Sequence, residues 1–129
     1  MKILTFTAIA LTALTTGILA SPVQAIPSTP TTLKQSVVYS NADLGRAKNL
    51  ARQAAERENG GLSQYSAEAA MHGPISEAPY RVNRDGTVTF DFLGGRPGFT
   101  VPTLQSIVTV NLSNWEVVIE YNGPIQAER

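Results

Sequence analysis

His72 is the single histidine of the chain and the first residue to consider for catalysis. An imidazole can act as a general base when a carboxylate orients it, and Glu68 and Glu77 lie close to it in sequence. None of the neighbouring serines lies in the Gly-x-Ser-x-Gly pattern of a nucleophile elbow, and Met71-His72-Gly73-Pro74 is typical of a turn. We therefore favour a turn histidine without a catalytic role. The alternative is a small hydrolase that uses His72 with one of the two glutamates.

Paired carboxylates would be needed for glycoside hydrolysis, which places two acids roughly 5 to 9.5 Å apart. Glu116 and Glu120 share one face of a predicted strand, but four residues at ~3.3 Å each separate them by about 13 Å. Asp91 is expected on a neighbouring strand, where an exposed acid usually only contacts water. The sequence therefore predicts no glycosidase pair.

Metal and phosphate sites find little support in the sequence. One histidine and no cysteine exclude sites built from several histidines or from thiolates. The Gly94-Gly95-Arg96-Pro97-Gly98 stretch lacks the Gly-Lys-Ser/Thr ending of a phosphate-binding loop and precedes no predicted helix. A calcium loop with its glycine at Gly86 would place Arg81 at the first ligand position and Phe92 at the last, and neither side chain supplies an oxygen. We predict no metal and no cofactor.

Two irregular stretches, 62–79 and 94–98, are the predicted contact surfaces, because binding residues are often carried by loops on a rigid scaffold. Within these stretches we expect exposed side chains that bind a partner. The candidate binding residues are Tyr65, Met71, His72 and Arg96.

The first 25 residues have the pattern of a secretory signal peptide. Met1-Lys2 is a short cationic head, residues 3–20 carry no charge, and small residues precede a predicted cleavage between Ala25 and Ile26. The alternative is an uncleaved anchor, because the apolar stretch approaches the ~20 residues that span a bilayer. Its threonines weaken that alternative. We predict an exported protein, periplasmic or extracellular, with no permanent membrane span after cleavage.

The chain after the leader fits one domain with one modest core. Residues 26–39 are rich in Pro, Ser and Thr and are predicted to form a flexible linker, followed by a single domain over 40–124 and a tail over 125–129. Without cysteine the domain must be stabilised by packing and not by disulfides. Loss of Lys2 with the leader leaves nine basic and ten acidic residues, a formal charge of −1. That balance indicates neither nucleic acid nor an anionic membrane surface as a partner.

The predicted elements define an α+β fold. A helix is expected over 41–58, because apolar residues recur at threes and fours and Asn59-Gly60-Gly61 then ends it. The Asp85-Gly86 turn predicts a hairpin. Strand patterns occur at 80–83, 87–92, 104–112 and 115–121, with a shorter one at 65–71, and Tyr121 is expected on the same face as Val117 and Ile119. The predicted architecture is one N-terminal amphipathic helix packed on a three- to four-stranded antiparallel meander.

Several short stretches are distinctive: 51–56, 59–63, 71–74, 85–87 before a strand with phenylalanines, and 121–125. Together they resemble small exported proteins of cyanobacteria that have no assigned function. The order of a helix followed by an antiparallel meander is similar to that of PepSY-type modules, export-compartment domains linked to peptidase control. The first resemblance implies export and the second implies only a layout, so neither implies an activity.

The sequence as a whole predicts a non-catalytic binding or interaction module of unknown ligand, located in the periplasm or outside the cell. The expected partner is a protein or glycan of the envelope. Besides the hydrolase, a structural envelope protein that self-associates is an alternative, because a long sheet edge permits it. The sequence leaves the oligomeric state open.

Overall fold

The computed structural model describes residues 38–127 and Gly17. The fold described below belongs to the unit Gln35–Arg129. The predicted signal peptide apart from Gly17, its cleavage between Ala25 and Ile26, and most of the predicted linker lie outside the described residues. Within the part of the chain that the structure describes, no helix is long and apolar enough to cross a membrane.

Helix α1 spans Asn41–Glu58, the same range over which the apolar spacing predicts a helix. Ser40 caps its start: the Ser40 Oγ accepts a hydrogen bond from the Asp43 N–H at 3.1 Å, a type of contact that stabilises a helix by about 1 kcal/mol. Gly60 and Gly61 follow its end with φ angles of 93° and 89°, which glycine adopts without a steric penalty. These residues stop the helix where the chain turns toward the sheet.

One antiparallel sheet accompanies the helix. Its strand order is β1-β3-β4-β5, and β2 pairs with the same edge of β3 as β1 does. The strands are β1 Ser66–Ala67, β2 Tyr80–Val82, β3 Thr87–Gly95, β4 Leu104–Asn111 and β5 Val117–Pro124, and two short 3₁₀ helices, η1 Ala69–Met71 and η2 Ile75–Glu77, lie between β1 and β2. The α+β class is confirmed. The sheet has five strands and not three or four, because the two-residue strand β1 pairs with the end of β3 beyond β2.

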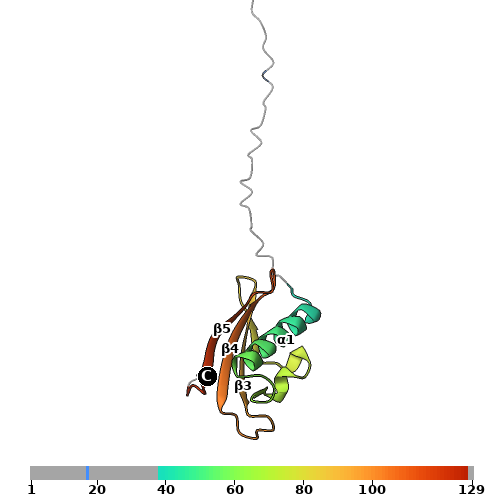
Figure 1. Ribbon diagram of the computed structural model, residues 1–129. Helices are drawn as coiled ribbons and strands as arrows, with labels where there is room; N and C mark the ends of the chain where they lie inside the picture. Colours follow the sequence, from blue (N-terminus) through green and yellow to red (C-terminus); the bar gives the residue numbers. More distant parts are fainter. Residues whose placement is uncertain (1–16, 18–37, 128–129) are drawn as a thin grey trace, which may run out of the picture. The chain divides into compact units, whose positions relative to one another are not determined.

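Helix α1 lies across one face of the sheet, which we call the inner face; the opposite face is the outer face (Figure 1). Three residues of β3, Val88, Phe90 and Phe92, point to the inner face and are fully buried, as are Val108 and Val110 of β4. The helix presents mainly alanines to them, so its backbone can approach the sheet closely. Full burial of each of these large apolar side chains contributes roughly 1.5–3 kcal/mol, which makes this layer the main source of stability.

A cation–π contact ties α1 to the turn between β4 and β5. The Arg46 guanidinium lies 4.0 Å from the centroid of the Trp115 ring. Trp115 has a φ of 62° and is the one non-glycine residue with positive φ among the described residues. That backbone conformation costs on the order of 1–3 kcal/mol. Trp115 also packs against the core, so packing and the arginine together hold the strained turn.

A β-bulge in β5 changes which residues face the helix. Val108 pairs with Ile119, whereas Ile107 pairs with Tyr121, so Glu120 is an extra residue on β5. Strict alternation predicts Tyr121 on the inner face together with Ile119. This prediction is wrong, because the extra residue shifts the alternation and places Tyr121 on the outer face with Ile107.

Strand β3 continues to Gly95, although the glycines at 94 and 95 predict a loop. The loop prediction is wrong at these two positions because the Tyr65 ring packs on the strand there. A Cβ at Gly94 would lie 2.3 Å from the Tyr65 hydroxyl oxygen, so only glycine leaves room for the ring. The turn is confined to the residues after Gly95, where the Phe99 N–H donates to Arg96 O at 2.9 Å.

Gly94→Ala should lower the free energy of unfolding by about 3 kcal/mol, because the added methyl group overlaps a fully buried ring. Gly45→Ala is the matched control: Gly45 lies within α1, nothing lies within 4 Å of its missing Cβ, and alanine should stabilise the helix by about 1 kcal/mol. Urea unfolding of the full chain measures both changes. A Gly94→Ala protein as stable as the wild type would show that the ring does not pack on this strand.

Candidate functional site

The segment between β1 and β2, which carries the predicted catalytic residues, is held by structural contacts. The Leu93 N–H donates to Glu68 Oε1 at 2.7 Å, and the Glu68 N–H donates to Leu93 O at 2.8 Å. The Glu68 carboxylate thus accepts from a backbone N–H of β3 that would otherwise donate to the carbonyl of a neighbouring strand. Glu68 is engaged with the backbone and does not orient His72.

Glu77 does not orient His72 either. Its Oε2 lies against Gly73, 2.7 Å from the position that a Cβ would occupy. The Gly73 carbonyl accepts a hydrogen bond from the Nζ of the buried Lys48, which joins this segment to α1. Among residues 38–127, the exposed His72 side chain forms no hydrogen bond or ion pair with Glu68 or Glu77. The predicted base and its orienting acid are therefore not assembled.

Two of the four candidate binding residues are buried, so their predicted exposure is wrong. Tyr65 and Met71 each have 0 % of their surface exposed. The reason is that 62–79 packs along α1 and the sheet through β1, η1 and η2, and does not leave the fold as an open loop. The other two candidates, His72 after η1 and Arg96 after β3, are exposed and lie on separate elements.

The Tyr65 hydroxyl begins a buried chain of polar side chains. It lies 3.5 Å from the Ser106 Oγ, which donates to Asn122 Oδ1 at 2.8 Å. Asn122 and Asn59 then exchange amide hydrogen bonds of 2.9 and 3.1 Å. Burial raises the pKa of the Tyr65 phenol above its ordinary value of 10.0. The chain links the end of α1 to β5.

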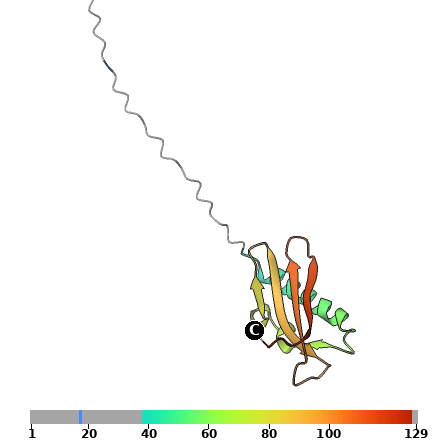
Figure 2. The same ribbon diagram turned by 90° about the vertical axis from the view of Figure 1, so that its left-hand side faces the viewer.

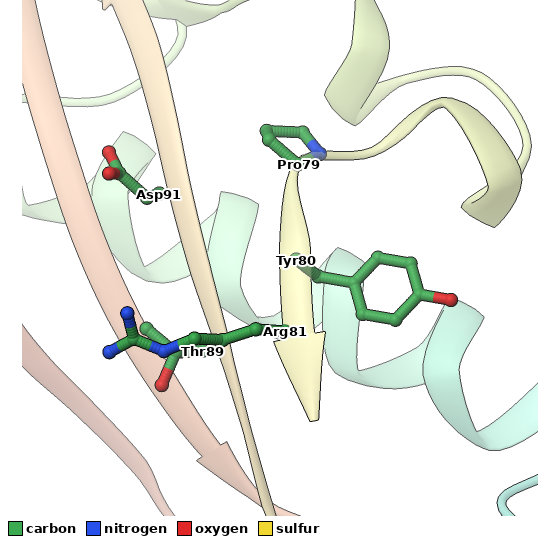
Figure 3. A pocket seen from close by; sticks show the side chains of 5 residues that line it. All are labelled: Pro79, Tyr80, Arg81, Thr89 and Asp91. Atoms are coloured by element: carbon green, nitrogen blue, oxygen red, sulfur yellow. The ribbon is translucent and has the colours of Figure 1, made fainter. Parts of the chain in front are cut away.

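The outer face is not covered by α1, and Figure 2 looks onto it with the helix behind the strands. Between β2 and β3 this face is hollowed, with a volume of about 350 Å³, lined by Pro79, Tyr80, Arg81, Thr89 and Asp91. Figure 3 shows Arg81, Thr89 and Asp91 pointing to one side of the strands and the Tyr80 ring pointing to the other. The volume is near the lower end of the roughly 300–1,000 Å³ range of ligand sites. A ligand here would meet a guanidinium and a carboxylate together.

A row of hydrogen bonds fixes the floor of this hollow. The Asn83 Nδ2 donates to Thr89 Oγ1 at 2.9 Å, and the Thr89 and Thr109 hydroxyls lie 2.9 Å apart. Beside them, the Gln105 Nε2 donates to Asp91 Oδ1 at 2.7 Å. Because these side chains already hold one another in place, little side-chain entropy would be lost when a ligand binds.

The predicted tail is also tied to the outer face. The Gln126 N–H donates to Gln105 Oε1 at 2.9 Å. The chain after β5 is therefore anchored beside the hollow at this residue, while residues 128–129 lie outside the described part of the chain.

The Tyr121 ring is a second feature of the outer face. Its hydroxyl donates to Pro124 O at 2.6 Å, and a Cβ at Gly123 would lie 3.1 Å from the hydroxyl oxygen, so the ring lies over Gly123. Sequence analysis missed this residue because alternation does not reveal the extra residue Glu120. The sequence does contain one signal for this arrangement: Gly123, two positions after Tyr121, has no side chain, so the aromatic ring can lie over it. Arg81 was considered only as a calcium ligand.

No metal centre is found in the range that the structure describes: no group of three or more His, Asp or Glu side chains there could hold an ion. Comparison with known protein families, with curated proteins and with solved structures gives no match. The resemblance to exported cyanobacterial proteins and to PepSY-type modules therefore stays a prediction. The function has to be argued from the side chains of the site.

Glu68→Ala should lower the free energy of unfolding by about 1–3 kcal/mol, because the Leu93 N–H loses its acceptor. Glu68→Gln keeps a side-chain oxygen and should cost clearly less. Urea unfolding of the two variants and the wild type measures the difference. Equal stability of all three proteins would refute the structural role, and Glu68 would again be a candidate catalytic acid.

Ionisation of Tyr65 should make stability fall as the pH rises above about 10. Because the pKa of Tyr65 is raised in the folded protein, the unfolded chain loses the proton first, at its ordinary pKa of 10.0. The stabilisation is complete below that pH and decreases as the pH rises toward the folded-state pKa. Tyr65→Phe removes this titration, so between about pH 9 and 11 the wild type should lose more stability than the variant in urea unfolding. Parallel losses would contradict the burial of the phenol.

Proposed function

We propose that the protein is an exported, non-catalytic binding module that contacts its partner through the outer face of its sheet. The observation that carries this proposal is the hollow between β2 and β3, where Arg81 and Asp91 lie on a sheet face that α1 does not cover. Export to the periplasm or cell exterior is part of the same proposal and rests on the pattern of the first 25 residues.

The arrangement of this face supports binding more than catalysis. The Thr89 hydroxyl is bonded to that of Thr109, and Gln105 donates to Asp91, which gives a rigid face with charged groups at one side. A general base needs a hydrogen-bonded partner or a strongly perturbed environment. His72 lacks the first with Glu68 and Glu77, as described above, so the hydrolase alternative has no geometric support.

The proposal predicts that partner capture depends on Arg81. The full chain, tagged and produced by export, would be used to capture material from envelope and medium fractions of the organism that makes it, with proteins and glycans identified by mass spectrometry. Arg81→Gln should reduce the captured species by about tenfold, the loss expected from one charge-assisted contact of about 1.4 kcal/mol. Arg57→Gln is the matched control, because Arg57 is an exposed arginine in the last turn of α1.

Three results would overturn the assignment of the outer face as the contact surface. The first is capture that is equal in wild type, Arg81→Gln and Arg57→Gln. The second is capture that survives Arg81→Gln but is lost in His72→Ala or Arg96→Ala, which would move the contact surface to the residues favoured by sequence. The third is the absence of any species retained by the folded wild type.

A further inference from the structure

Strand β5 forms one margin of the sheet, and the edge that it turns away from β4 pairs with no other strand in the part of the chain that the structure describes (Figure 1). We call this edge the β5 edge. We infer that it binds an extended basic segment of a partner protein, which pairs with residues 116–119 as an added strand. The inference goes beyond the proposed function, because it concerns the margin of the sheet and not the hollow between β2 and β3.

The backbone of β5 offers hydrogen-bonding groups to such a segment. The Asn111 N–H donates to Glu116 O at 2.8 Å, so Glu116 directs its carbonyl group toward β4. The direction of these groups alternates along an antiparallel strand, so Val118 also faces β4, whereas Val117 and Ile119 direct their N–H and C=O groups to the β5 edge. The spacing of these groups matches the ladder of an added strand.

The bulge at Glu120 limits the length of the segment that can be added. A bulge bends its strand and interrupts the regular ladder, so regular pairing is expected to stop after Ile119. Residues 116–119 still offer a longer regular stretch than the two residues of β1 or the three residues of β2. This stretch accommodates about five residues of an extended segment.

The side chains at the β5 edge favour a basic partner. Glu116 and Glu120 are exposed and lie two residues to either side of Val118, which is 49 % exposed. The Asn114 Nδ2 donates to Glu116 Oε2 at 3.4 Å, but neither carboxylate forms an ion pair within residues 38–127. Residues 112–124 contain no lysine or arginine. Because opposite charges on adjacent strands stabilise their pairing, a segment with lysine or arginine is favoured here.

The same charges disfavour a second copy of this chain as the occupant. Two β5 edges that met would each contribute Glu116 and Glu120 and no cation to neutralise the carboxylates of the other. Like charges on adjacent strands destabilise their pairing, and bulges in edge strands hinder contact between two sheets. Val118 lies between the two acids and offers an apolar contact to an aliphatic side chain of the partner. The expected segment therefore alternates basic and aliphatic residues.

Chemical-shift mapping and amide hydrogen exchange of the isotope-labelled full chain test the inference. The probe is a capped seven-residue peptide in which lysine alternates with valine and threonine, and it is compared with the same peptide carrying glutamate in place of each lysine. We expect the lysine peptide to shift the amides of Val117 and Ile119 and to slow their exchange, because carbonyl groups of the added strand accept from them. The glutamate peptide should bind about tenfold more weakly or not at all.

Two controls separate the addition of a strand from attraction between charges alone. Methylation of the peptide nitrogens that would face β5 removes their N–H donors without changing the charge, and it should weaken binding about tenfold or more. Glu116→Gln combined with Glu120→Gln should weaken binding of the lysine peptide about fivefold, or about 1 kcal/mol for two exposed charge pairs. Glu58→Gln, which changes an exposed acid at the end of α1, should leave binding unchanged.

The absence of peptide shifts at Val117 and Ile119 would overturn the inference. Equal binding of the methylated and unmethylated peptides would do so too, as would binding that the double variant does not weaken. Shifts of the same amides that grow with protein concentration, without peptide, would identify a second copy as the occupant. Peptide shifts confined to Arg81 and Thr89 would instead place the peptide in the hollow and support only the proposed function. Capture that is independent of Arg81 would remove the proposed function and leave the β5 edge standing.

Discussion

The packing of a single alanine-rich helix on a five-stranded sheet determines most of what this protein can do. One helix of 18 residues covers one face of the sheet, so the apolar residues must be concentrated there and the other face must be compatible with water. Val88, Phe90 and Phe92 satisfy the first condition, and Thr89 and Asp91, between them on the same strand, satisfy the second. The division of one strand between a core and a surface therefore also separates the residues that stabilise the fold from those of the proposed binding face.

The edge of β3 that does not pair with β4 shows how a small domain without disulfides closes its fold. This edge is shared between β1 and β2, and the interval between them is closed by the Glu68 carboxylate on the Leu93 N–H. The Tyr65 ring on Gly94 and the Lys48 amine on the Gly73 carbonyl hold the same segment against the sheet and the helix. Three of the residues that make this segment resemble a catalytic or binding loop, Tyr65, Met71 and Glu68, are thus used for packing and for hydrogen bonds with the backbone.

The outer face gains its distinctive chemistry from one irregularity. The extra residue Glu120 turns Tyr121 away from the core and brings Asn122 into it, where Asn122 joins Ser106 and Asn59. Bulges are frequent next to functional sites, where they redirect a side chain. In this protein the redirected side chain is an aromatic ring, which lies over Gly123 on the outer face.

The sequence by itself determined the elements whose signals are local. Helix α1 follows from the apolar spacing and the Asn59-Gly60-Gly61 end, the β2–β3 hairpin from Asp85-Gly86, and the inward face of β3 from strict alternation. Each of these signals depends on neighbouring residues and on the periods of the backbone. Tertiary structure decided the rest. Gly94 remains in a strand because a ring from elsewhere in the chain occupies the space above it, and Tyr121 faces outward because pairing with β4 accommodates one extra residue. The Asp85-Gly86 turn predicts the pairing of β2 with β3, but only the folded chain shows that Arg81 and Asp91 line one hollow beside it.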